Sequence, residues 1–228
     1  MKRILVLLSL SLIVVSGAYA QKIYVQGGVN LANITKDKDG NTDDNKALYS
    51  FNTGLMGQFG LSKIIDIETG LLFTGKGSKS ESNFGNGDFI KTTFNPLYVE
   101  LPVNLLIKFP LVTKNSNLLV SAGPYVAMGV AGKSKYESKI GPLSSRSESN
   151  IVFNNDNPTT AQQEDASYYK TKRFDYGLNF GGGVALKSII LKVNYGLGLA
   201  KINSTETNNS TDKQNKFRTL SLSVGIPL

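Results

Sequence analysis

Residues 97–109 read LYVELPVNLLIKF. The odd positions of this stretch are all apolar, whereas the even positions include Glu100, Pro102, Asn104 and Lys108. Successive side chains of a strand point to opposite faces, so a two-residue period predicts a strand with one apolar face and one mixed face. The charges therefore share one face, and the surroundings of that face decide what kind of protein this is.

The same period recurs along the rest of the chain. Strands are predicted over 23–33, 51–61, 65–77, 97–109, 118–131, 174–186, 189–200 and 219–226. The segments have about 10 to 14 residues, whereas strands of globular proteins usually have about 5 or 6. Strands that cross a membrane need roughly 9 to 11 residues. The lengths therefore favour membrane-spanning strands.

The connections between these strands alternate strictly in length. The long ones are 34–49, 78–92, 132–170 and 201–216, and the short ones are 62–64, 110–117 and 187–188. In an up-and-down order, all long connections fall on one side, as in outer-membrane barrels with their long outer loops. The pattern predicts an all-β fold, an eight-stranded antiparallel up-and-down transmembrane β-barrel with four long outer loops and three short periplasmic turns.

The composition of the two rows of side chains indicates which row faces outward. A soluble barrel would hide its apolar row and show a strongly charged one to water. The polar row here is dominated by Gly, Asn, Ser and Ala, which suit the crowded lumen of eight strands. The apolar row carries aromatic residues towards both ends, as interfacial girdles do. We expect the apolar row to face lipid, with a soluble periplasmic barrel as the alternative.

The charged and amide residues of the polar row then point into the lumen. A charge in so narrow a space is costly unless it is paired, so we expect a structural network of ion pairs and hydrogen bonds. Its expected members are Asp66, Glu68, Lys76, Glu100, Asn104, Lys108, Asp175, Asn179, Lys192 and Asn194. Pro102 donates no ladder hydrogen bond, so a bulge or a missing bond is expected there.

The N-terminal residues form a separate unit. A basic start at 2–3, an apolar stretch over 4–15 and the small-residue motif AYA at 18–20 predict a cleaved secretory signal peptide, residues 1–20. The remaining 21–228 form the barrel domain.

Two residue types are missing from the whole sequence. It contains no cysteine and no histidine, which excludes disulfides, histidine-based zinc sites and Ser-His-Asp catalysis. We expect no catalytic, cofactor-binding or metal-binding residue. Without Lys2 and Arg3 the chain has 23 basic and 17 acidic residues. The basic residues do not cluster and no nucleic-acid motif occurs, so the charge suits solubility or attraction to anionic surface sugars and lipids.

Four segments resemble a known family. YVELPVNLLIKF, SAGPYVAMGVAGK, RFDYGLNFGGGVAL and LKVNYGLGLAKI are similar to the PorT-type, porin-like outer-membrane β-barrel family of Bacteroidetes-like Gram-negative bacteria. The resemblance covers nearly the whole of 21–228 and implies an eight-stranded barrel in the outer membrane, without implying an activity. Many such barrels end in an aromatic residue, whereas this chain ends in Ile226-Pro227-Leu228.

Two outer loops are candidate sites. The segment Asp37–Asp43 offers oxygen side chains at alternate positions, but a calcium loop also needs glycine at its sixth position and an acid at its twelfth. Thr42 and Leu48 stand there, so we expect a solvated turn and leave calcium binding open. The loop over 132–170 is long and polar, and loops of this length are usually functional or disordered.

The expected function follows from these features. We expect a non-enzymatic outer-membrane barrel with a packed polar lumen and a structural, surface-interaction or export-accessory role. Outer-membrane lipid surrounds it, and a surface or export-machinery protein would contact the 132–170 loop; no nucleic-acid partner is expected. A narrow porin for small solutes is the main alternative, and an outer-membrane enzyme, weakened by the absence of histidine, is a further one.

Overall fold

The described part of the protein is built almost entirely of β-strands. The computed structural model describes residues 19–35, 45–112, 116–153, 170–202 and 215–228. The strands are β1 (Tyr19–Thr35), β2 (Asn45–Lys46), β3 (Leu48–Gly60), β4 (Ile65–Gly75), β5 (Ser78–Gly85), β6 (Asp88–Pro110), β7 (Asn117–Ile140), β8 (Leu143–Asn150), β9 (Val152–Phe153), β10 (Lys170–Thr171), β11 (Phe174–Ala185), β12 (Ile190–Gly198) and β13 (Lys216–Pro227). No helix in these ranges is long and apolar enough to cross a membrane.

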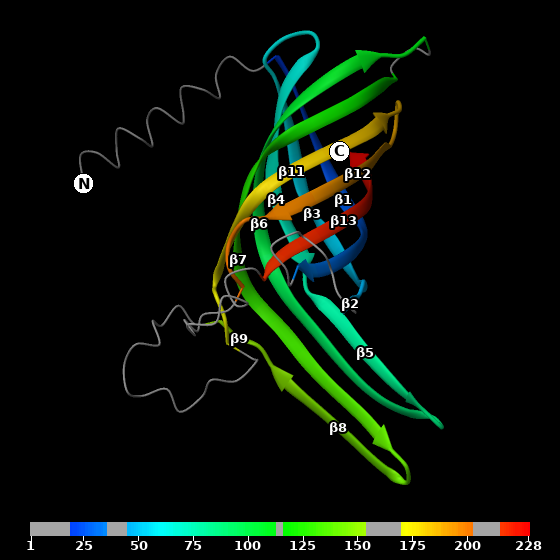
Figure 1. Ribbon diagram of the computed structural model, residues 1–228. Coiled ribbons are helices and arrows are strands. Elements are labelled where there is room, and N and C mark those ends of the chain that lie inside the picture. Colours follow the sequence, from blue (N-terminus) through cyan, green and yellow to red (C-terminus); the bar gives the residue numbers. More distant parts are fainter. Residues whose placement is uncertain (1–18, 36–44, 113–115, 154–169, 203–214) are drawn as a thin grey trace, which may run out of the picture.

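Eight strands form a closed ring in the order β1-β3-β4-β6-β7-β11-β12-β13. Each pairs antiparallel with its neighbours, and β13 pairs back with β1 from Tyr24↔Pro227 to Thr35↔Lys216. In Figure 1 the first strand, in blue, accordingly lies beside the last, in red. The predicted eight-stranded up-and-down barrel is confirmed.

The wall of the barrel has the predicted orientation. Along β12, Leu191 and Val193 expose 41% and 49% of their surface, whereas Lys192 between them exposes 7%. Along β1, Val29 exposes 57% and its neighbour Asn30 none. Apolar residues on the outside and polar residues on the inside are the reverse of a soluble barrel, and only a lipid surrounding makes this arrangement favourable.

Aromatic residues stand at both ends of the apolar band. Phe51, Phe174 and Tyr176 point outward near the long connections, and Phe109 points outward near the short turns. The rings of Phe51 and Phe73 pack with their centroids 5.8 Å apart. These positions match the expected interfacial girdles.

Two of the expected outer loops are strands instead. The β5–β6 and β7–β8 hairpins pair with each other through β6 and β7, and they extend beyond the barrel as seen in Figure 1. We call β5, residues 88–96 of β6, residues 132–140 of β7, and β8 the projecting sheet. The expectation of loops over 78–92 and 132–150 was wrong. β5, β8 and the end of β7 alternate mainly between charged residues and Ser, and residues 88–92 read DFIKT, so neither part has the alternation of apolar and polar residues that indicates a strand.

The hairpin tips of the projecting sheet are tied together. Gly141 turns the β7–β8 hairpin with φ 58°, and its backbone N–H donates to Asp88 Oδ1 at 2.7 Å. Asn86 turns the β5–β6 hairpin with φ 51° between two glycines that also have positive φ. Small residues at these positions let the chain reverse tightly, so that both hairpins remain regular up to their tips.

The hydrogen-bond ladder between β4 and β6 is interrupted at Pro102. The β4–β6 register passes from Thr69↔Val103 to Leu72↔Glu100 with no pair at Pro102. The Thr69 hydroxyl instead donates to the Pro102 carbonyl at 2.7 Å. A ladder bond is thus missing at Pro102, as expected. The register shift between β6 and β7 lies elsewhere, at Leu97/Tyr98.

Candidate functional site

Apolar side chains form a packed layer in the lumen towards each end. Near the short turns, a layer that we call the turn-side layer consists of Tyr24, Met56, Leu106, Leu119 and Ile190. Near the long connections, the outer layer consists of Ile34, Tyr98, Tyr125, Ala127, Ile202 and Phe217, with Phe94 and Phe153 packed against it. In the outer layer, the ring of Tyr98 meets those of Phe153 and Phe217 edge to face, at 5.6 and 5.7 Å. Such packed aromatic groups fill much of the lumen at this end.

A first polar cluster surrounds Glu68 of β4. Its carboxylate forms an ion pair with Lys192 of β12 on the other side of the lumen and is completely buried. The Tyr24 hydroxyl and the Gln58 amide donate to Glu68 Oε2 at 2.9 and 3.0 Å. The cluster therefore joins β1, β3, β4 and β12 through one carboxylate, with its charge neutralised inside the protein.

A second polar cluster surrounds Lys76, which follows β4. Its Nζ lies 2.9 Å from Glu100 Oε2 and 2.8 Å from Asp175 Oδ2. It also lies 4.0 Å from the centroid of the Tyr125 ring, whose hydroxyl donates to Asp175 Oδ2 at 3.0 Å. Asn179 donates its amide to Glu100 Oε1 at 3.1 Å. One cation thus holds two carboxylates, and Tyr125 and Asn179 each donate to one of them, whereas the other Asp175 oxygen, Oδ1, has no hydrogen-bond partner in the described structure.

Amide and hydroxyl groups form a third cluster next to the other two. Asn30 donates to Thr74 Oγ1 at 2.9 Å and to the Gly75 carbonyl at 3.0 Å. Asn52 donates to Asn30 Oδ1 at 2.7 Å, and its own Oδ1 accepts from Ser223 at 3.0 Å. These bonds connect β1, β3, β4 and β13 without using a charge.

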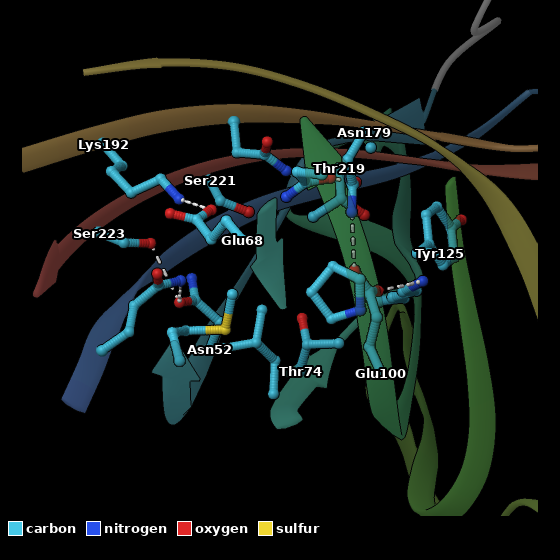
Figure 2. Close-up of a pocket in the computed structure, with 18 residues that line it drawn as sticks. Asn52, Glu68, Thr74, Glu100, Tyr125, Asn179, Lys192, Thr219, Ser221 and Ser223 are labelled. Atoms are coloured by element: carbon cyan, nitrogen blue, oxygen red, sulfur yellow. Dashed lines mark hydrogen bonds and ion pairs between the residues drawn. The ribbon is translucent and has the colours of Figure 1, made fainter. Parts of the chain in front are cut away.

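A small chamber remains between these groups. Figure 2 shows Glu68 and Lys192 at one end of it and Glu100, Asn179 and Tyr125 at the other. It provides a volume of about 40 Å³ for the centres of water-sized molecules. One water needs roughly 10–15 Å³ by this measure, so the chamber suits a few waters and not a solute. Gln26 Oε1 and Asn104 Oδ1 line it without a protein partner in the described structure, as acceptors for such waters would.

The structure places all ten residues of the predicted lumen network on the inner face. Lys108 pairs with Asp66 at 2.6 Å near the short turns, and Asn194 donates to Asn179 Oδ1 at 3.3 Å. Asn104 lines the chamber. The remaining members lie in the clusters around Glu68 and Lys76.

Several important lumen residues were not among the predicted ten. Tyr24, Asn30, Asn52 and Tyr125 all form buried hydrogen bonds, and each belongs to the polar row of its own predicted strand. The alternation of side chains along each strand therefore indicated that these residues face the lumen, but the predicted network consisted mainly of charged residues. Phe217 lies outside the predicted strand over 219–226, because β13 begins earlier, at Lys216.

None of the three polar clusters has the composition of a metal site. Within the described ranges, no three acidic, histidine or cysteine side chains gather as cation ligands. The segment Asp37–Asp43, for which calcium binding was left open, lies outside the described residues.

Comparison with known proteins agrees with this architecture. Residues 19–204 match the model of a family described as outer membrane protein beta-barrel domain. No curated protein matches the sequence.

Among solved structures, the chain is similar to Ail, the attachment invasion locus protein of Yersinia pestis, in complex with the heparin analogue sucrose octasulfate. The similarity covers 92% of this chain and 100% of Ail, with 14% sequence identity and a TM-score of 0.40. Neisserial surface protein A is similar over the same shares at 10% identity and a TM-score of 0.42. These structural likenesses are too distant to carry an argument, whereas the family model spans most of the sequence. The chain therefore belongs to the outer membrane protein β-barrel domain family, whose members lie in the outer membrane.

Proposed function

We propose that the protein is a non-enzymatic outer-membrane anchor that holds the projecting sheet outside the cell as an interaction surface. The observation that carries the proposal is the packed lumen, which supports a sealed barrel. Two apolar layers and paired buried charges leave a chamber of about 40 Å³, which is too small for solute passage. A barrel that transports nothing acts through what it presents to the outside.

The ten lumen residues have a structural role in this proposal. Lys76, Glu68 and Asp175 each bury nearly all of their side chains and each has an oppositely charged partner. A general acid or base needs contact with a substrate, and a group enclosed in this way has none. The ion pairs therefore tie opposite walls of the barrel together.

The projecting sheet is the part of the protein best suited to contact a partner. Its β7–β8 half covers the described beginning of the 132–170 segment, through which we propose that a surface or export-machinery protein is contacted. Charged side chains gather on one of its faces, among them Lys91, Lys133, Glu137 and Arg146. Charges on a rigid sheet beyond the membrane steer association with other surface molecules.

Binding of membrane vesicles tests this function. Cells would display either the full chain or a variant in which both hairpins are shortened to tight turns next to the barrel. Labelled outer-membrane vesicles from the same organism are then added, prepared with and without the gene for this protein. The full chain should retain vesicles and the shortened one should not. Equal retention by both chains would overturn the proposal, and heat-modifiable gel migration controls for a folded barrel.

A narrow porin is the alternative function. The ring of charged and amide groups around the chamber favours it, because rings of this kind line selective pores. Ion conductance separates the two functions, since a sealed barrel passes no steady current.

Two finer assignments accompany the proposed function. The YVELP and AGPY segments support placement among PorT-type barrels, and the motif AYA at 18–20 supports removal of residues 1–20 as a signal peptide. The mass of the mature protein tests the second assignment, because cleavage after Ala20 would leave Gln21 as the first residue.

A further inference from the structure

The outermost strand of the projecting sheet has one edge without a partner strand in the described part of the chain. β8 pairs with β7 through eight consecutive residue pairs, from Lys133↔Asn150 to Ile140↔Leu143, without a register shift. The opposite side of the same sheet is partly covered, because β2 pairs with β5. β8 contains no proline and no bulge, two of the features that protect an edge strand from pairing with another chain. It does carry two charges of opposite sign, Arg146 and Glu148, which repel another edge only when like charges meet.

The backbone geometry shows which groups face this free edge. The Ile151 N–H donates to the Gly132 carbonyl at 3.0 Å, in register with the β7–β8 ladder. The N–H and C=O of one residue point to the same side of a strand and alternate from residue to residue. The N–H and C=O groups of Ser144, Arg146 and Glu148 therefore point away from β7, where an added strand would accept and donate hydrogen bonds.

The charges on this edge of one copy are complementary to the charges on the same edge of a second copy. Arg146 and Glu148 lie two residues apart and hence on one face of the sheet. When a second β8 pairs antiparallel with Ser147 on the two-fold axis, Arg146 of each copy lies opposite Glu148 of the other. A shift of the axis to position 146 or 148 would instead place two arginines or two glutamates opposite each other, which is unfavourable.

The charge pattern of each sheet continues across this junction. In one copy, Lys91 pairs in register with Glu137, and Glu137 with Arg146. In the second copy, Glu148 pairs in register with Lys135. The joined row reads Lys91, Glu137, Arg146 and then Glu148 and Lys135 of the second copy, with alternating sign throughout.

We propose that the free edge of β8 binds β8 of a second copy of this chain, antiparallel and centred on Ser147. β8 runs from the hairpin tip towards the barrel, so its antiparallel partner brings the second barrel to the opposite end of the joined sheet. The two copies then belong to membranes that face each other. This inference rests on the proposed function and names its partner, namely the same protein on a neighbouring cell.

Single cysteines test the register, since the chain has no cysteine of its own. Ser147 of both copies would form a non-hydrogen-bonded pair with Cα atoms about 4.5 Å apart, within disulfide range. Ser145 would lie opposite Ser149, so two copies of either residue would be about 14 Å apart. Cells displaying Ser147→Cys should form cross-linked dimers under mild oxidation. Ser145→Cys and Ser149→Cys should do so only when the two populations are mixed.

Charge reversal provides an independent test. A population of cells that displays Arg146→Glu, or one that displays Glu148→Arg, should form roughly tenfold fewer cell–cell clusters or fewer still. Each change makes both Arg146–Glu148 pairs between two copies repulsive. A mixture of the two populations should cluster again, since each then opposes the other's charge. Lys139→Glu makes the same change of charge one strand away from the edge and should leave clustering intact.

The outcomes separate this inference from the proposed function. Self-pairing is supported when Ser147→Cys forms dimers alone, whereas Ser145→Cys and Ser149→Cys form them only with each other. It is also supported when a mixture of the two charge-reversed populations clusters again. The absence of Ser147 dimers, or equal cross-linking at all three positions, overturns it. If vesicles that lack the protein still bind the projecting sheet, the proposed function stands with a different partner.

Discussion

Lys76 and Asp175 form an ion pair of 2.8 Å in the lumen, although 99 residues separate them in the sequence. Lys76 follows β4 and Asp175 belongs to β11, so β6 and β7 lie between them in the ring. Because Glu100 accepts from the same ammonium group, one side chain holds three strands of the wall in a fixed relation. The barrel is thus stabilised across its interior as well as along its ladders.

Replacement of Lys76 by Met should destabilise the barrel strongly. It leaves two buried carboxylates without their cation, and removal of one partner of a buried ion pair costs about 3–5 kcal/mol. Urea unfolding in detergent micelles measures the loss. Lys139→Met on the exposed projecting sheet is the control and should change the free energy of unfolding by about 0.5 kcal/mol or less. A loss for Lys76→Met no larger than that of the control would contradict a structural role for the ion pair.

Replacement of Tyr24 by Phe should remove one hydrogen bond and little volume. The hydroxyl donates to the buried Glu68 carboxylate at 2.9 Å, and a hydrogen bond to a charged group contributes about 1.5–3 kcal/mol. The same unfolding experiment measures it. Tyr176→Phe removes a hydroxyl from an outward-facing ring and should be nearly neutral, so equal effects at both positions would argue against the cluster around Glu68.

A charge on the outer wall should be costly only within the lipid. Val193→Arg places a cation in the middle of an outward-facing row, where about 2–4 kcal/mol is expected. Leu186→Arg, beside a short turn, should cost about 1 kcal/mol or less. Folding into lipid vesicles gives both values. If Val193→Arg folds as well as the unchanged protein, this row does not contact lipid tails.

The projecting sheet should loosen in acid. Hydrogen bonds from Lys133 and Lys135 hold the pKa of the Glu148 carboxyl below its usual value. A lowered pKa in the folded state stabilises the protein at pH above the usual value, and this contribution is lost as the pH falls through the lowered value. Amide hydrogen exchange over 133–150 should show more opening at about pH 3 than at about pH 7, after correction for the intrinsic rate. Glu148→Gln should reduce the difference, and a hairpin equally closed at both values would disprove the effect.

The barrel was predictable because membrane strands follow one rule along their whole length. Val193 outside and Lys192 inside differ by one residue, and the same alternation holds along the strands of the ring. Loop lengths supplied the rest of the topology, since short turns force neighbouring strands to be antiparallel. Local sequence thus determines the order and the orientation of the wall.

The pairing inside the lumen and the projecting sheet were less accessible to sequence reasoning. Parity places Glu68 and Lys192 inside, but which charges meet depends on the stagger of strands distant in the sequence. The projecting strands have no continuous apolar face, and their regularity comes from pairing with each other. Residue periodicity cannot show such pairing before the register of β6 and β7 is known.

Ion conductance of the purified barrel in planar lipid bilayers tests the central claim most directly, namely that the lumen is sealed. The protein is inserted from detergent, and its heat-modifiable gel migration shows that it is folded. A sealed lumen should pass no steady current above that of the bare bilayer over a wide range of voltages. Regular current steps from the folded, unchanged protein would contradict it and would identify the lumen as a pore.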